Sequence, residues 1–327
     1  MQYIDVFNGD ADGICALHQL RLANPVPDPQ LITGVKRDIR LLEQIDDAAD
    51  TTITVLDISL AKNLAALTRL LSEAHSITYI DHHYCAEIPQ AKTLHAHIDP
   101  DPQTCTSLIV DELLEGAHPC WALVGAFGDN LDDIATTKGN AIGLTPDQIE
   151  TLREIGRLLN YNGYGFSLDD LHIPPADLFF EVHRYPDPFV MSNSSSMLKQ
   201  LRQGYADDIT NTVSLTPYEE TEHGRIFILP DTPWSRRVVG DFSNQIAREQ
   251  PDKAHATAIL TDGDCYRISV RAPLQTRLGA DTLCLQFPTG GGRAGAAGIN
   301  ALPIGQFETF LHRFSSHFSQ PPHSITP

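Results

Sequence analysis

Residues 3–23 have the sequence YIDVFNGDADGICALHQLRLA, and this stretch predicts the start of the fold. Its first part, 3–7, is a short apolar run typical of a buried strand, and 13–23 carry leucines at helical spacing. Asp10 and Asp12 lie between these two elements, only two residues apart. Because neighbouring carboxylates repel each other, we expect either a positive charge close to both or a plain turn.

Strand and helix patterns continue to alternate after this segment. Strands are predicted at 31–35, 51–58 and 76–83, and an amphipathic helix is predicted at 60–74. Such alternation is typical of βαβ units that build a parallel sheet. The sequence therefore predicts an α/β fold that begins with a parallel sheet.

The pattern changes twice along the rest of the chain. After residue 100 it is mainly helical, 184–196 are rich in Pro and Ser, and strand patterns return from 216 onward. With 327 residues, 42% of them hydrophobic, the chain is long enough for two cores. We expect a first domain at 1–185, a linker at 186–215, and a smaller mixed α/β domain at 216–327.

The charge restricts the partners. The formal net charge is −19, which argues against a protein that grips long duplex nucleic acid by its phosphates. A small phosphorylated substrate remains compatible, because a metal ion can supply positive charge locally. An acidic surface that serves solubility alone is the alternative interpretation.

The sequence also carries expectations about location. No apolar run is long enough to span a membrane, and the N-terminus lacks the pattern of a signal peptide. The six cysteines are scattered and form no CxxC pair, which favours reduced core cysteines. We therefore expect a cytoplasmic protein that does not bind membranes.

Acidic and imidazole side chains follow the predicted strands. They are Asp10 and Asp12 after the first strand, Asp57 after the third, Asp81, His82 and His83 after the fourth, and Asp129 at a helix end. The carboxyl ends of parallel strands meet at one edge of a sheet. So many carboxylates in one crevice require cations, and oxygen ligands with imidazole suit Mn²⁺ or Mg²⁺. Two such ions about 3.5–4 Å apart form a clamp for phosphoryl transfer.

Each part of this set also has a plain structural interpretation. The segment NGDADG resembles the start of a calcium-binding loop, but the final ligand position holds Gln19 and a strand precedes it. The DADG segment alone is a turn, and the histidines of IDHH at 80–83 could be ordinary surface residues. Asp57 could cap the helix that follows it. Their joint arrival at one edge of the predicted sheet is what favours a site.

Taken in order, the motifs resemble those of a known family. DADG (10–13), VLDIS (55–59), IDHH (80–83) and GAFGDN (125–130) resemble the four motifs of the DHH phosphoesterase superfamily. That superfamily includes RecJ-type exonucleases, family II pyrophosphatases, exopolyphosphatases, nanoRNase/pAp phosphatases and cyclic dinucleotide phosphodiesterases. GGGRAGAAGIN (290–300) resembles the glycine motif of the DHH-associated domain. The resemblance covers most of the chain.

The resemblance implies a centre of two Mn²⁺ or Mg²⁺ ions in a cleft between the two domains. Its metal ligands would be Asn8 and Asp10 at the first ion, Asp12, His82 and Asp129 at the second, and Asp57 as the bridge. His83 would face the substrate phosphate and assist the leaving group, and Asp81 would support the ligands from behind.

The sequence departs from the family pattern in two places, the first motif and the glycine motif. Many members carry a histidine at the position of Val6, and RecJ-type members carry an aspartate at the position of Asn8. A neutral amide oxygen holds a metal more weakly than a carboxylate, so the first ion is expected to bind weakly and to depend on substrate oxygens. Arg293 stands where a histidine usually follows the three glycines, and arginine can bind phosphate bidentately.

The second domain is expected to bind substrate. Gly290, Gly291 and Gly292 would let backbone amides approach a phosphate, although a flexible loop is the alternative. Arg293 and Arg271 are the predicted phosphate contacts. Lys36 and Arg37 follow a strand and could reach the crevice, but a solvated turn is the favoured interpretation for both.

These observations predict a stand-alone, metal-dependent phosphoesterase that hydrolyses short oligonucleotides or small nucleotides; a homodimer is compatible with this. One alternative is a phosphoanhydride hydrolase that acts on pyrophosphate or polyphosphate. A second alternative is a metal-poor nucleotide-binding module without turnover, which the departures at Val6 and Asn8 motivate.

Overall fold

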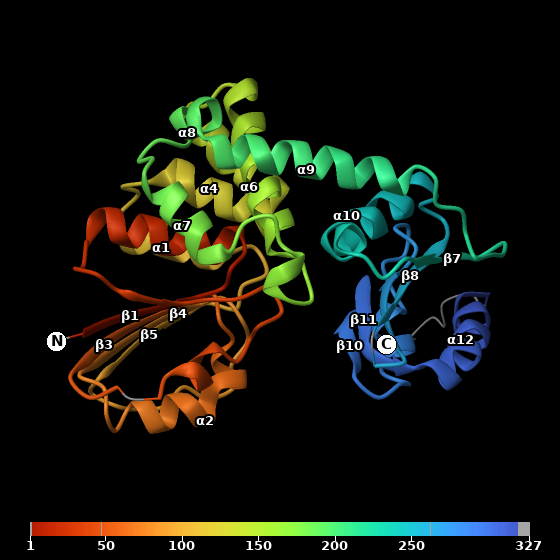
Figure 1. The fold of residues 1–327 in the computed structure, drawn as a ribbon, viewed down its shortest axis with the longest axis horizontal. Helices are drawn as coiled ribbons and strands as arrows, with labels where there is room; N and C mark the ends of the chain where they lie inside the picture. Colours follow the sequence, from red (N-terminus) through yellow and green to blue (C-terminus); the bar gives the residue numbers. More distant parts are fainter. Residues whose placement is uncertain (1, 47, 262, 320–327) are drawn as a thin grey trace, which may run out of the picture. The chain divides into compact units, whose positions relative to one another are not determined.

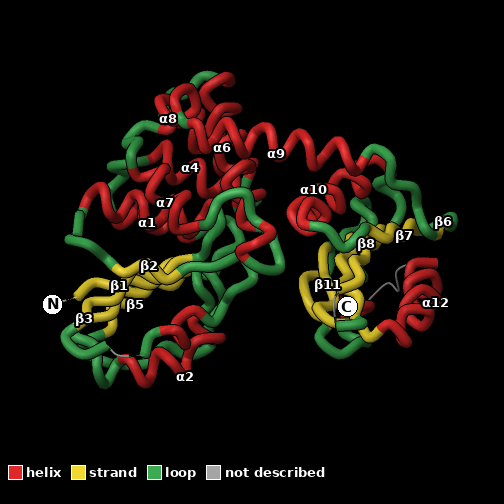
Figure 2. Tube along the Cα trace, viewed as in Figure 1, coloured by secondary structure: helices red, strands yellow, loops and turns green. Residues whose placement is uncertain are grey.

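The computed structural model describes residues 2–46, 48–261 and 263–319 (Figures 1 and 2). The chain divides into two compact units, 1–205 and 206–327, and each is described by itself. The segment 186–215, for which a linker is expected, contains the helices α8 (Pro188–Ser194) and α9 (Ser196–Thr212).

The first unit is built on a parallel sheet, as the sequence predicts. Its five strands follow the order β2-β1-β3-β4-β5, and every neighbouring pair is parallel. The strands are β1 (Gln2–Phe7), β2 (Gln30–Ile32), β3 (Thr51–Leu56), β4 (Ser76–Asp81) and β5 (Leu94–Ile98). Phe7 pairs with Leu56, and Leu56 pairs with Ile80, so the three central strands end level with one another.

Helices cover both faces of this sheet. Figure 1 shows α1, α4, α6 and α7 on one side and α2 on the other. The helices are α1 (Ala11–Ala23), α2 (Leu60–Leu70), α3 (Thr106–Leu113), α4 (Pro119–Gly128), α5 (Asp132–Ala141), α6 (Pro146–Gly163) and α7 (Pro175–His183), with 3-10 turns η1 (Leu41–Gln44) and η2 (Leu168–Asp170). Two apolar clusters result, one on each face, and together they hold the sheet between them.

The sequence patterns did not single out every element of this unit, and the strand β5 and the helix α5 show why. β5 alternates between half-buried and exposed residues and carries two histidines, because it forms the edge of the sheet. α5 is rich in polar residues and buries only Ala135 and Gly139, so it lacks the apolar stripe on which a prediction would rest.

The second unit has a six-stranded mixed sheet in the order β10-β11-β9-β8-β7-β6. Among its described residues, β7 and β8 pair in parallel and the other neighbouring strands pair antiparallel. The strands are β6 (Glu219–Glu220), β7 (Gly224–Leu229), β8 (Ala254–Thr261), β9 (Cys265–Arg271), β10 (Gly290–Arg293) and β11 (Ala296–Pro303); the helices are α10 (Pro233–Glu249), α11 (Ala280–Cys284) and α12 (Phe307–Ser319), with the 3-10 turn η3 (Ile304–Gln306). The chain therefore has the two-part α/β architecture expected from its sequence.

The glycine-rich segment of this unit is a hairpin. Gly290–Arg293 pair in antiparallel register with Ala296–Ile299. A Cβ atom on Gly290 would lie 1.8 Å from the carbonyl oxygen of Cys284, so this position has room only for glycine. The small residues thus serve close backbone packing, which a loop interpretation does not anticipate.

All six cysteines are free thiols, and Cys15, Cys105 and Cys284 are buried. Within the described ranges, no helix combines the length and the hydropathy needed to cross a bilayer.

His18 of α1 gives the first unit a predicted sensitivity to acid. Its Nδ1 lies 3.2 Å from Nδ1 of His183, and its ring centroid lies 4.6 Å from that of Trp121. Burial lowers the pKa of His18 to about 3. In the unfolded chain a histidine titrates near pH 6.5, so between about pH 6.5 and 3 the unfolded state binds the extra proton. The stability that His18 contributes is complete above this window and is lost as the pH falls through it.

We therefore expect the wild-type protein to lose about 2 kcal/mol of unfolding free energy through this group between pH 7 and pH 5. His18→Gln should show a correspondingly shallower decline, measured by urea unfolding at each pH. His95→Gln, at an exposed position of β5, is the matched control. Equal pH slopes for the wild type and His18→Gln would contradict the prediction.

Candidate active site

Three loops meet at one edge of the sheet, where β1, β3 and β4 end at the same height. The backbone N–H of Asn8 donates to the Leu56 carbonyl at 3.2 Å, and that of Asp57 donates to the Ile80 carbonyl at 3.1 Å. Asp57 has φ of +57°, a left-handed conformation that aspartate tolerates better than most residues. The backbone thus fixes the side chains that follow each strand at one edge of the sheet.

The two aspartates of the first loop have different partners. Asp10 caps α1 and accepts the backbone N–H of Gly13 at 3.1 Å. Asp12 accepts the N–H groups of Thr106 at 2.8 Å and Ser107 at 2.7 Å, the first two residues of α3. The positive end of α3 therefore orients the buried carboxylate of Asp12. Each carboxylate oxygen keeps further lone pairs for another ligand.

His82 lies close to both Asp57 and Asp129. The Nε2 atom of His82 lies 3.4 Å from Oδ1 of Asp57 and 3.8 Å from Oδ2 of Asp129, at the end of α4. Ligands about 2.1 Å from a common octahedral ion lie roughly 3 Å apart. Both separations exceed this value, so a divalent ion shared by the three side chains would require them to move closer together. Candidate ligand atoms of Asp57, His82 and His83 also lie within 4.8 Å of one another.

His83 is held by a buried carboxylate. Its Nδ1 lies 2.6 Å from Oδ1 of Asp81, whose side chain is fully buried. Burial would lower the pKa of His83, but the hydrogen bond and the charge of Asp81 outweigh it and raise this pKa. The imidazole is 44% exposed, so a substrate can reach it. Asp81 supports His83 from behind.

Lys36 also belongs to this cluster, which corrects the expectation of a solvated turn. Its Nζ donates to Oδ2 of Asp10 at 2.6 Å and to Oδ1 of Asn160 at 3.0 Å, and it lies 3.7 Å from Oδ1 of Asp129. Asn160 of α6 thus supplies a polar partner at the site. The spacing of residues in the sequence does not indicate that Lys36 or Asn160 would lie at this site.

The charges of the cluster are unevenly balanced. Burial, together with Asp10 and Asp12, raises the pKa of Asp57 well above its usual value. Burial also raises the pKa of Asp129, although Lys36 opposes the change. At Asp10 the nearby ammonium of Lys36 outweighs burial and lowers the pKa. The uncompensated negative charge therefore lies around Asp57 and Asp129, where a cation would relieve it.

The predicted substrate-binding residues lie in the second unit. Gly290, Gly291, Gly292 and Arg293 form β10, and Arg271 ends β9. Arg293 pairs with Ala296, which pairs on its other side with Arg271, so the two arginines share one row across the sheet. Arg293 is exposed. Arg271 donates to Oδ1 of Asn244 at 2.8 Å. Contact with substrate stays a prediction for all of them.

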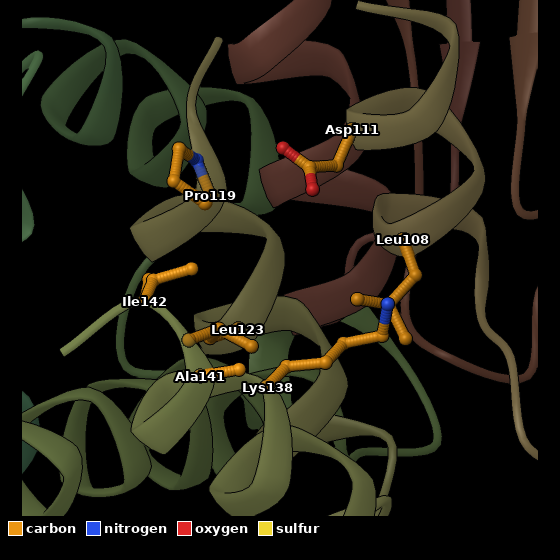
Figure 3. A pocket seen from close by; sticks show the side chains of 7 residues that line it. All are labelled: Leu108, Asp111, Pro119, Leu123, Lys138, Ala141 and Ile142. Carbon is orange, nitrogen blue, oxygen red and sulfur yellow. The ribbon is translucent and has the colours of Figure 1, made fainter. Parts of the chain in front are cut away.

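A separate pocket of roughly 250 Å³ lies on α3, α4 and α5 (Figure 3). Apolar side chains line most of it, and Asp111 and Lys138 supply its charged groups. None of the residues with predicted roles lines this pocket, so it is distinct from the candidate active site.

Comparison with known proteins was made at the level of sequence and of structure. No family model matches the sequence, and no curated protein matches it. Among solved structures, the exonuclease RecJ bound to manganese superposes with a TM-score of 0.62 at 16% identity, over 98% of this chain and 91% of that one. RecJ from Thermus thermophilus in complex with Mn²⁺ gives a TM-score of 0.64 at 17% identity, over 98% of this chain and 52% of that one.

A third neighbour is the pGpG-specific phosphodiesterase PggH from Vibrio cholerae, with a TM-score of 0.57 at 12% identity. The match covers 98% of this chain and 99% of that one. The chain has the DHH fold. The fold that we expected from the resemblance to DHH proteins is thus confirmed. At identities this low, the likeness shows the fold alone. In the DHH fold of this chain, the four motifs occupy the strand ends and the helix end described above.

Proposed function

We propose that this DHH-fold chain is a divalent-metal-dependent phosphoesterase that hydrolyses short oligonucleotides or small nucleotides. The carboxylates of Asp57 and Asp129 on either side of His82, together with the imidazole of His83, carry the proposal. The neighbours support it, because RecJ is an exonuclease bound to manganese and PggH is specific for pGpG.

The donor set fits a divalent ion of the Mn²⁺ or Mg²⁺ class. Asp57, His82 and Asp129 would hold it, and Asp12 would add a carboxylate that α3 has already oriented. When bound, such an ion polarises a phosphoryl oxygen and lowers the pKa of a bound water. Oxygen ligands with one imidazole match the preference of Mn²⁺ better than that of a thiophilic metal.

His83 and Asp81 would act on the leaving group. Asp81 accepts a hydrogen bond from Nδ1–H of His83, which leaves Nε2 to face the substrate. The hydrogen bond and the charge of Asp81 raise the pKa of His83, which favours the protonated form. The imidazolium can therefore bind a phosphate oxygen and protonate the oxygen that departs.

The substrate is expected to be small. A chain of net charge −19 lacks the basic surface that long nucleic acids require. Arg293 and the glycine hairpin of β10 are proposed to add phosphate contacts. A phosphoanhydride hydrolase for pyrophosphate or polyphosphate is the second candidate, because the same donor set would also act on phosphate without a base.

A substrate panel with Mn²⁺ present tests the proposal. The panel comprises pApA, pAp, cyclic di-AMP, pyrophosphate, polyphosphate and a single-stranded oligonucleotide. Turnover of a nucleotide substrate is expected. Turnover confined to pyrophosphate or polyphosphate would support the second candidate, and nucleotide binding without any turnover would contradict an enzymatic role.

Arg293→Ala is expected to raise KM for the nucleotide substrate about tenfold, with kcat little changed, because one charge-assisted phosphate contact is lost. Steady-state kinetics measure both constants. Arg248→Ala, which removes an exposed arginine from α10, is the matched control. An unchanged KM for Arg293→Ala would remove Arg293 from the proposed binding site.

A further inference from the structure

Lys36 occupies a position that the surrounding backbone defines. Its N–H donates to the Gly163 carbonyl at 2.8 Å, and its carbonyl accepts from Nδ2 of Asn8 at 3.4 Å. A Cβ atom on Gly9 would lie 2.0 Å from the Gly34 carbonyl oxygen, so the loops after β1 and β2 touch. The segment that carries Lys36 is therefore fixed against the first loop and against the end of α6.

The ammonium of Lys36 donates hydrogen bonds to Oδ2 of Asp10 and Oδ1 of Asn160. It also lies 3.7 Å from Oδ1 of Asp129, beyond hydrogen-bond distance but close enough for an ion pair. An ammonium offers three donors and accepts nothing. Only 22% of the side chain is exposed. The site thus holds a cation that the chain itself provides.

The first metal position does not fit a divalent ion. The ligands implied there are Asn8, Asp10 and the bridging Asp57. The charge of Asp10 is already balanced, because its Oδ2 binds the Lys36 ammonium, whereas the partners of Asp12 are neutral N–H groups. Among the described residues, Oδ1 of Asn8 is buried and lacks a hydrogen-bond partner, but this is a single neutral oxygen. A divalent ion beside Asp10 would also face the charge of Lys36 at close range.

We propose that the ammonium of Lys36 replaces the first divalent ion, so that this chain binds one ion, at Asp57, His82 and Asp129. The inference rests on the proposed function, because it concerns the metal content of the same site. Lys36 then balances the charge of Asp10 at every metal concentration. Occupancy of the position at Asp57, His82 and Asp129 alone depends on the metal concentration.

Metal content tests this directly. The chelator-treated protein is equilibrated with excess Mn²⁺, passed over a desalting column, and analysed for bound manganese and by electron paramagnetic resonance. One Mn²⁺ per chain with the spectrum of an isolated ion is expected. Two Mn²⁺ per chain with an exchange-coupled spectrum would overturn the proposal.

A double variant tests the role of Lys36 itself. Asn8→Asp with Lys36→Ser removes the ammonium and supplies a carboxylate, and we expect it to bind a second Mn²⁺ and to show the coupled spectrum. Lys62→Ser, at an exposed position of α2, removes the same charge elsewhere and should still bind one ion. Circular dichroism confirms that each variant is folded. A folded double variant that binds one ion would overturn the proposal.

The readout separates this inference from the proposed function. One bound Mn²⁺ without turnover of any panel substrate would contradict the enzyme and leave the single-ion site standing. No bound Mn²⁺ would contradict both.

Discussion

Asp57→Asn is expected to lower kcat for phosphoester hydrolysis by about 10³-fold or more, a loss of roughly 4 kcal/mol of transition-state stabilisation. Oδ1 of Asp57 lies 3.4 Å from Nε2 of His82 and 3.3 Å from Oγ1 of Thr106. The amide keeps the shape of the side chain but removes the charge that would hold the ion. Asparagine also tolerates the φ of +57° at this position, so the fold should persist. Initial rates with saturating Mn²⁺ measure the effect.

Asp50→Asn is the matched control for this variant. Asp50 is exposed and has φ of +55°, and it precedes β3 whereas Asp57 follows it. The same chemical change at the opposite end of the strand should leave kcat unchanged. Retention of more than about a tenth of the activity by Asp57→Asn would contradict the assigned role, because metal catalysis supplies several kcal/mol.

Asp5→Ala is expected to reduce the free energy of unfolding of the first unit by about 3–5 kcal/mol. Asp5 of β1 and Arg21 of α1 form a buried ion pair, with Nε of Arg21 2.8 Å from Oδ2 of Asp5. Arg21 also donates to Oγ1 of Thr54 at 2.8 Å. Removing Asp5 leaves the guanidinium charge buried without its counterion. Urea unfolding monitored by circular dichroism measures the change.

Two further variants separate this charge effect from loss of a contact. Glu43→Ala breaks the exposed pair with Arg40 and should cost less than about 1 kcal/mol. Asp5→Leu combined with Arg21→Met removes both charges and should be more stable than Asp5→Ala. If Asp5→Ala stays within about 1 kcal/mol of the wild type, the pair does not stabilise the unit in this way.

The period of the apolar residues was enough to predict the first sheet. β1, β3 and β4 are buried on both faces, and buried parallel strands appear in sequence as apolar, β-branched runs. The edge strand β5 and the polar helix α5 lack that signal. Asp5 was not singled out, because its counterion is sixteen residues away in sequence and local patterns do not show such pairs.

The candidate site was predictable where a strand end, or the helix end at Asp129, delivers a residue. Asp57 and His82 follow directly from that rule, and the structure brings both to one edge. Lys36 and Asn160 reach the same point through long-range contacts, which depend on how the loop after β2 meets α6. Their side chains give no pattern in sequence, so the charge that replaces an ion became visible only in three dimensions.

Hydrolysis of a 5′-phosphorylated dinucleotide by chelator-treated protein, before and after addition of Mn²⁺, tests the central claim most directly. We expect no product before Mn²⁺ is added, product formation after it, and none from Asp57→Asn in either condition. Undiminished hydrolysis by the chelator-treated protein, or equal rates for Asp57→Asn and the wild type, would contradict a metal-dependent phosphoesterase at this site.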